Sequence, residues 1–286
     1  MPAFLFAFLS YIGWGTGDIF GAIASRKIGA YAATFWIFAI GILLFSLYIP
    51  FALNDLQALT LPIFLLNLTL GFLYISGNVA LNEALVRSNP SLVLTISGSF
   101  GTLVVVLSLL FLDERISIAQ ALIIAVIFLG VFLCTFDFRI LKKKQKFDAG
   151  VLFALYSMTS FALYFTFIKQ IIHQIGWFWP NFISMLWTPM IFFYMRWKHM
   201  KVKNPIASKS LFPIAASAFL LRAGDFAFNL GISLGYTVLV APIAGAYPTL
   251  SAIIAYKVFK DPITKQQIIG IIITLCGIVL LSLLSI

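Results

Sequence analysis

FLYISGNVALN at residues 72–82 and FLLRAGDFAFN at residues 219–229 are the two stretches that decide the fold. They align without a gap, with Gly77 opposite Gly224 and an asparagine closing each stretch. Apolar segments match one another by chance, so the shared glycine and asparagine carry more weight than the shared leucine. The pair predicts that one apolar unit occurs twice in the chain.

The composition shows which solvent surrounds these apolar units. Hydrophobic residues make up 62% of the 286 residues and charged residues 10%, with a mean hydropathy of +1.06. Soluble domains contain about 45–50% apolar and about 25% charged residues. This chain cannot bury so much apolar surface in a water-soluble core, so lipid must surround most of it.

A helix needs about 20 apolar residues to cross the hydrocarbon core. Ten stretches meet this requirement, and their continuous apolar character excludes the alternation of barrel strands. The expected fold is therefore an all-α integral membrane protein with ten transmembrane helices. The expected spans are residues 3–22, 30–51, 61–86, 91–112, 116–136, 150–171, 178–196, 211–234, 237–258 and 266–284.

Basic residues gather in the loops that follow the odd-numbered spans. These residues are Arg26, Lys27, Arg87, Arg139, Lys142, Lys143, Lys144, Lys146, Arg196, Lys198, Lys201, Lys203, Lys209, Lys257, Lys260 and Lys265. The positive-inside rule places such loops in the cytoplasm, which puts both termini outside. The same loop charges account for the net charge of +10 without a nucleic-acid partner.

The duplication continues beyond the opening stretches with the same offset. Further matched pairs are Gly98/Gly245, Thr102/Thr249, Gln120/Gln267 and Gly130/Gly277. We expect a first five-span repeat at residues 1–140, a basic cytoplasmic linker at 141–149 and a second repeat at 150–286. An odd number of spans in each half gives the second half the opposite orientation, and inverted repeats are typical of secondary transporters.

Several motifs in these repeats resemble the drug/metabolite transporter superfamily, EamA type. They are Asn82–Val93 with its copy Asn229–Ile243, Leu112–Ser117 with its copy Phe259–Thr264, Tyr247–Leu250, and Trp14-Gly15. The resemblance covers nearly the whole chain and departs from the pattern at Asp261 and Gly101. It implies transport of an amino acid, metabolite, sugar or drug. It also implies cytoplasmic termini, whereas the loop charges place them outside.

Ionisable side chains inside spans are costly and normally face protein or a water-filled cavity. Arg222, Asp225 and Asn229 follow one another at helical spacing and share one helix face. Asn78 and Asn82 form the matching stripe at the equivalent positions of the first half. We interpret both stripes as the lining of a central cavity that binds solute. The alternative is a purely structural Arg222–Asp225 ion pair with amides that bridge helices.

Asp18, Trp14 and Tyr164 complete the set of candidate binding or coupling residues. Asp18 lies within the first span and has two interpretations, a proton-coupling carboxylate or an interfacial residue. Trp14 and Tyr164 lie in spans one and six, where we expect them to flank the cavity.

The same sequence argues against several other classes of function. It contains no Walker A segment, no HExxH pattern and no clustered catalytic constellation, so we expect no enzyme activity, metal or cofactor. The favoured function is a secondary carrier of a small solute in the cell membrane, driven by a proton or by exchange. The alternative is a non-transporting or lipid-handling partner subunit on the same fold. Whether the protein is a monomer or a homodimer stays open.

Overall fold

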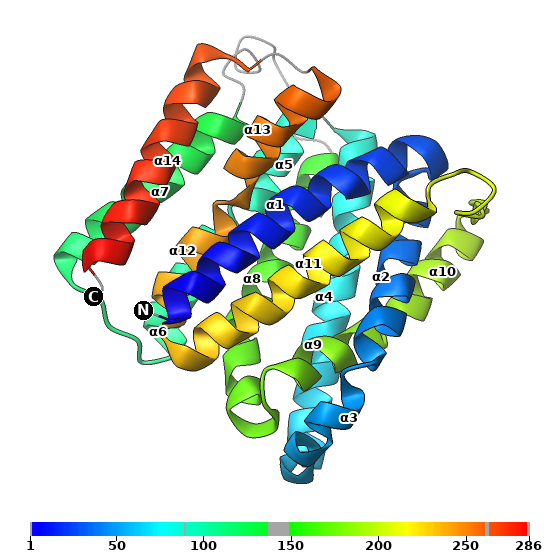
Figure 1. Cartoon of the computed structure of the whole chain (residues 1–286), viewed down its shortest axis with the longest axis horizontal. Helices are drawn as coiled ribbons and strands as arrows, with labels where there is room; N and C mark the ends of the chain where they lie inside the picture. Colours follow the sequence, from blue (N-terminus) through cyan, green and yellow to red (C-terminus); the bar gives the residue numbers. More distant parts are fainter. Residues whose placement is uncertain (1, 89, 137–148, 261–262, 285–286) are drawn as a thin grey trace.

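The computed structural model describes residues 2–88, 90–136, 149–260 and 263–284, which form helices joined by short loops (Figure 1). The helices of the first half are α1 (Pro2–Ile28), α2 (Ala30–Ser46), α3 (Ile49–Ala52), the 3₁₀ helix η1 (Leu53–Ala58), α4 (Leu61–Arg87), α5 (Pro90–Gly98), α6 (Phe100–Phe111) and α7 (Ile118–Thr135). The helices of the second half are α8 (Ala149–Ile175), α9 (Phe178–Met185), α10 (Thr188–Trp197), α11 (Leu211–Leu234), α12 (Thr237–Gly245), α13 (Tyr247–Phe259) and α14 (Lys265–Leu284). Except for Ala149, the basic linker at 141–149 lies outside the described residues, as does Asp261.

The expected all-helical membrane architecture is confirmed for the described residues. Eight of their helical segments are long and apolar enough to cross a membrane, and a ninth qualifies if the pair from Ala30 to Ala58, bent by 64°, is one span. The expected span at residues 178–196 is not one continuous helix. It divides into α9 and α10, and Pro189 at the start of α10 has no N–H to continue the helical ladder across the break.

Two other expected spans break at equivalent positions of the two halves. Ser99 separates α5 from α6, and Ala246 separates α12 from α13, each with a ψ of 0°. Pro248 follows the second break and cannot donate to the turn before it. Ser99 donates its side-chain hydroxyl to the carbonyl of Thr95 at 2.7 Å. Both breaks lie where the two halves meet.

Small residues allow α1 and α11 to pack side by side in opposite directions (Figure 1). Ser217 donates to the carbonyl of Gly17 at 2.9 Å near one end of the pair. Gly231 lies beside Ala7 near the other end. Between these points an added Cβ on Gly13 would come within 2.7 Å of the α11 backbone, so a larger side chain would push the helices apart.

The outer surface of the bundle is apolar. Large hydrophobic side chains that remain exposed include Leu5, Leu43, Leu129, Phe193 and Val279. Such a surface would be unfavourable in water and suits contact with lipid tails.

Candidate functional site

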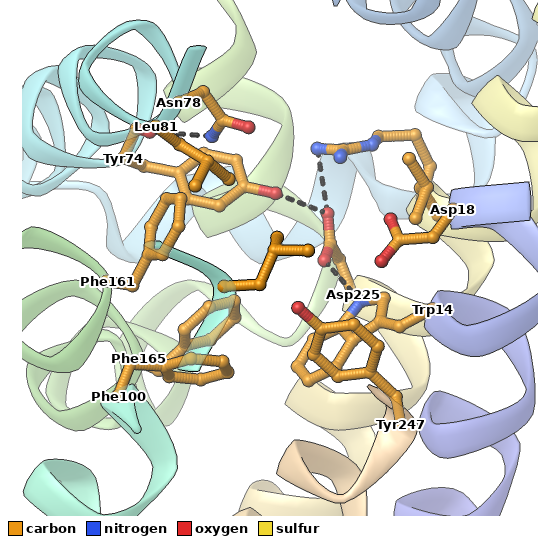
Figure 2. Close-up of a pocket in the computed structure, with 13 residues that line it drawn as sticks. Trp14, Asp18, Tyr74, Asn78, Leu81, Phe100, Phe161, Phe165, Asp225 and Tyr247 are labelled. Atoms are coloured by element: carbon orange, nitrogen blue, oxygen red, sulfur yellow. Dashed lines mark hydrogen bonds and ion pairs between the residues drawn. The ribbon is translucent and has the colours of Figure 1, made fainter. Parts of the chain in front are cut away.

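A cavity with two connected parts lies inside the bundle. Its inner compartment is about 150 Å³ and contains Trp14, Tyr74, Phe100, Phe161, Phe165 and Asp225 in its wall (Figure 2). Its larger vestibule is about 660 Å³, within the usual size range of small-molecule sites, roughly 300–1,000 Å³. The residues that line both parts are Asp18, Asn78, Leu81, Leu94, Leu221, Arg222 and Tyr247.

The vestibule leads from these shared residues to one end of the bundle. Its wall contains the ends of α1, α4, α7 and α13, including Arg26, Leu85, Thr135 and Phe259. The starts of α2 and α14 complete this wall with Thr34 and Gln267. These helix ends adjoin the loops that carry the basic residues.

Asp225 on α11 is held by three side chains from three different helices. Arg222 Nη1 lies 2.7 Å from Asp225 Oδ2, and the Tyr74 hydroxyl donates to the same oxygen at 3.1 Å. Trp14 Nε1 donates to Asp225 Oδ1 at 2.8 Å. Because both charged side chains are at most 4% exposed, the ion pair is a buried one that depends on these hydrogen bonds.

Arg222 is also covered by aromatic rings. Its guanidinium carbon lies 4.5 Å from the Phe38 ring centroid and 5.6 Å from that of Tyr74. Gly41 on α2 makes room for it, since an added Cβ there would lie 3.0 Å from the arginine Cγ. The positive charge is therefore neutralised by Asp225 and stabilised by ring faces.

Asp18 on α1 differs from Asp225 in its hydrogen-bond and ionic partners. Its carboxylate has no hydrogen bond and no basic group within 4.0 Å among the described residues. Figure 2 shows it pointing into the space that Asp225 and Tyr247 also face. The side chain is exposed to the cavity.

The two predicted asparagines of α4 both reach the cavity. Asn78 lines both compartments and donates Nδ2 to the carbonyl of Tyr74 at 2.8 Å, which leaves its carboxamide oxygen toward the cavity (Figure 2). Asn82 lines the vestibule and donates Nδ2 to the hydroxyl of Thr34 at 3.2 Å.

Asn229 and Tyr164 lie outside the cavity wall. Asn229 is buried and donates Nδ2 to the carbonyl of Trp177 at 2.8 Å. Tyr164 is fully buried, donates its hydroxyl to Asn181, and stacks on Tyr74 with ring centroids 4.4 Å apart. Tyr164 therefore supports the Tyr74 ring that contacts Asp225.

The model of the family described as "EamA-like transporter family" matches residues 1–136 and 148–283. This chain belongs to the EamA-like transporter family. The predicted resemblance is thereby confirmed, and the chain is a multi-pass membrane protein of the drug/metabolite transporter superfamily, whose EamA-like members are transporters and not enzymes.

A solved structure described as "Crystal structure of protein" superposes on the chain with a TM-score of 0.80. The match covers 99% of this chain and 97% of that one at 14% sequence identity, so it shows the shared fold alone. No curated protein matches the chain.

In this EamA-like protein Trp14 was predicted from the sequence to flank the cavity, but the other aromatic rings of the wall were not. Phe100, Phe161, Phe165 and Tyr247 come from α6, α8 and α13, and nothing in the local sequence distinguishes them from lipid-facing rings. Tyr74 had a detectable signal, because it precedes Asn78 by one helical turn and shares its face.

Proposed function

We propose that this protein is a secondary carrier that moves a small solute by alternating access across the cell membrane. Ten spans arranged as two inverted five-span halves, residues 1–140 and 150–286, would bind the solute in the cavity between them. The observation that carries the proposal is an asymmetry between equivalent residues. Gly245 packs against Gly101, whereas an added Cβ on Gly98, the repeat partner of Gly245, would meet nothing within 4 Å.

Contacts between α7 and α14 support the inverted arrangement. An added Cβ on Gly130 would lie 2.4 Å from the Thr274 hydroxyl, and one on Gly277 would lie 2.7 Å from the Ile127 side chain. Gly277 is the repeat partner of Gly130, and Thr274 is the repeat partner of Ile127. Such reciprocal contacts are the signature of a twofold axis between equivalent elements.

The other main helix pairs also agree with a twofold axis between the halves. Helix α1 packs along α11, and their repeat partners, α8 and α4, pack along each other. Helix α1 also packs on α12 and α13, as α8 packs on α5 and α6. A pseudo-twofold axis would therefore interchange the halves and leave these contacts in place.

One helix pair breaks the symmetry. Helix α6 packs along α12, but the equivalent α13 and α5 face each other across the vestibule, where Leu94 of α5 and Pro248, Ser251 and Ala255 of α13 line the wall. If the two halves exchange these arrangements, α13 packs along α5 and α6 separates from α12. The protein then has two states of similar construction, which open to opposite sides of the membrane.

A buried carboxylate holds the closed side together. Glu114, in the loop after α6, accepts hydrogen bonds from the backbone N–H groups of Thr237 and Val238 at 2.8 Å and 2.7 Å. It also accepts one from Lys169 Nζ at 2.7 Å. The carboxylate thus satisfies the N-terminus of α12 and ties the first half to two helices of the second half.

The described state would be open to the cytoplasm, because the vestibule ends at the basic loops. We assign solute contact or coupling to Arg222, Asp225, Asn78, Asn82, Asp18 and Trp14. Tyr164 and Asn229 would position neighbouring groups. A non-transporting subunit would be expected to have a solid interior, and the cavity therefore favours the carrier.

Flux through proteoliposomes tests the proposal. Purified protein would be reconstituted and offered a panel of amines, amino acids, sugars and carboxylates, with and without a pH gradient. The carrier accumulates or exchanges at least one of them, above the level of empty vesicles. Absence of any protein-dependent flux under all gradients would overturn the proposal.

Two cysteine pairs test the alternation itself, in protein whose Cys134 and Cys276 are replaced by serine. An added Cβ on Gly101 would lie 3.7 Å from the Gly245 Cα, and one on Gly245 would lie 3.6 Å from the Gly101 Cα. The pair Gly101→Cys with Gly245→Cys should therefore form a disulfide that locks the described state. The equivalent pair, Gly98→Cys with Pro248→Cys, should form only in the opposite state. Oxidation of either pair stops flux and reduction restores it, while each single cysteine variant keeps its flux after oxidation. Failure of the second pair to form in transporting protein argues against alternation.

A further inference from the structure

Asp18 presents an uncompensated negative charge where the two cavity compartments join. It lines both compartments and has no hydrogen-bond or basic partner among the described residues. The other cavity carboxylate, Asp225, accepts from Trp14 and Tyr74 and pairs with Arg222. A solute therefore meets one carboxylate already neutralised and one available.

The remaining charges of the wall do not neutralise Asp18. Among the described lining residues the charged ones are Asp18, Arg26, Arg222 and Asp225. Arg26 lies two helical turns beyond Asp18 on α1, about 12 Å along the helix, and its guanidinium stacks 3.8 Å from the Phe259 ring centroid at the vestibule mouth. Arg222 is bound to Asp225. No described charge at the junction of the compartments therefore balances an ionised Asp18 carboxylate.

Aromatic rings surround the space next to this charge. Trp14 contacts the rings of Phe100, Phe165 and Tyr247 at centroid distances of 6.3 Å, 5.2 Å and 5.8 Å. Figure 2 shows Trp14 and Tyr247 on the same side of the inner compartment as Asp18, with Phe100 and Phe165 across the space from them. Aromatic faces attract cations and also accept apolar groups, and both effects strengthen where water is excluded.

We propose that the solute of this cavity is an organic cation, a substituted ammonium or guanidinium. Its charged head binds the Asp18 carboxylate and its apolar body lies among the rings of the inner compartment. An anion binds less tightly than a cation in this cavity, because Asp18 repels it and Arg222 is already paired with Asp225. The inference rests on the proposed carrier function and adds to it the charge of the solute.

Binding to the purified full-length protein in detergent tests the charge preference without requiring transport. The probes are 2-phenylethylamine, its neutral analogue 2-phenylethanol and the anion phenylacetate, measured by calorimetry. The amine should bind at least about tenfold more tightly than either analogue, as expected when a charge-assisted contact is added in a partly desolvated site. Equal or tighter binding of the alcohol or the anion overturns the inference.

Four variants locate the interaction. Asp18→Asn keeps the shape of the side chain and should remove the preference for the amine, whereas Asp55→Asn removes an exposed carboxylate of η1 and should leave it unchanged. If Asp18→Asn does not fold, Tyr247→Leu should weaken amine binding several-fold, about the range of one cation–π contact, and Tyr247→Phe should retain it. Unchanged amine binding in a folded Asp18→Asn or Tyr247→Leu protein overturns the assignment.

These results separate the two proposals. Flux of some solute that is equal in wild-type and Asp18→Asn protein supports the carrier and rejects the cation. Asp18-dependent amine binding in a protein without flux of any solute supports the cation site and rejects the carrier.

Discussion

Trp14 Nε1 donates a 2.8 Å hydrogen bond to Asp225 Oδ1, between residues 211 positions apart in the sequence. The bond joins α1 of the first half to α11 of the second beside the inner compartment. The same indole packs on Phe165 and Phe228. One side chain therefore both orients the buried carboxylate and forms part of the cavity wall.

Trp14→Phe should remove this hydrogen bond while it keeps an aromatic ring in the wall. Asp225 would lose one of three partners, and we expect a loss of about 1.5–3 kcal/mol in unfolding free energy, the range for hydrogen bonds to charged groups. Flux should also fall. Denaturation in detergent measures the first effect and proteoliposome flux the second. Trp197→Phe is the matched control, since Trp197 is 71% exposed; a similar loss there would show that the effect is not specific to the Asp225 bond.

Removal of Asp225 alone should be worse for stability than removal of the whole ion pair. Asp225→Leu leaves Arg222 buried without a counter-charge, which typically costs about 3–5 kcal/mol. The double variant Arg222→Leu/Asp225→Leu removes both charges and should unfold at a higher temperature than the single variant, while flux is lost in both. Thermal unfolding in one detergent compares them, with Asp55→Leu as the exposed control. A double variant less stable than Asp225→Leu contradicts this interpretation.

The single changes Arg222→Ala and Asp225→Asn should still allow assembly but lower transport. Both break the buried ion pair and change the charge at the cavity wall. Normal flux in both variants would show that neither residue belongs to the proposed solute site.

Glu114→Gln should loosen the side of the bundle that is closed in the described structure. The amide loses the ion pair with Lys169 and accepts the N–H groups of α12 less strongly. The loss of one charge-assisted contact, about 1.5–3 kcal/mol, would favour opening of this side by roughly 10-fold to 100-fold. The measurement is the rate at which a Gly245→Cys thiol reacts with a membrane-impermeant maleimide, in protein without other cysteines. Asp113→Asn changes the adjacent exposed residue and should leave the rate unchanged.

The loop charges predict that the C-terminus lies outside the cytoplasm. The vestibule mouth is at the opposite end of the bundle from the start of α1 and the end of α14. A C-terminal reporter that is active only in the cytoplasm should therefore be silent, and the same reporter placed after Lys27 should be active. The reverse result would show that the C-terminus is cytoplasmic and that the described state is open to the outside.

The helical periodicity of the sequence accounts for the polar part of the site. Arg222 and Asp225 were predicted because they are ionisable residues inside a span and share one helix face. Asn78 was predicted because it is the repeat partner of Asp225. Asn229 belongs to the same stripe, yet it reaches the Trp177 carbonyl at the start of α9 and not the cavity. A polar stripe predicts the side of the helix on which its side chains lie, but the neighbouring helix determines what those side chains contact.

The sequence by itself determined the membrane-helical class and the family, because apolar length and motifs are local properties of the chain. Only the tertiary structure decided where helices break, which aromatic rings enclose the cavity, and that Gly245 is packed while Gly98 is open. Those features arise from contacts between residues far apart in the sequence. The sequence also cannot show which of two equivalent helix pairs, α6 with α12 or α13 with α5, is packed together, because both pairs have the same sequence pattern.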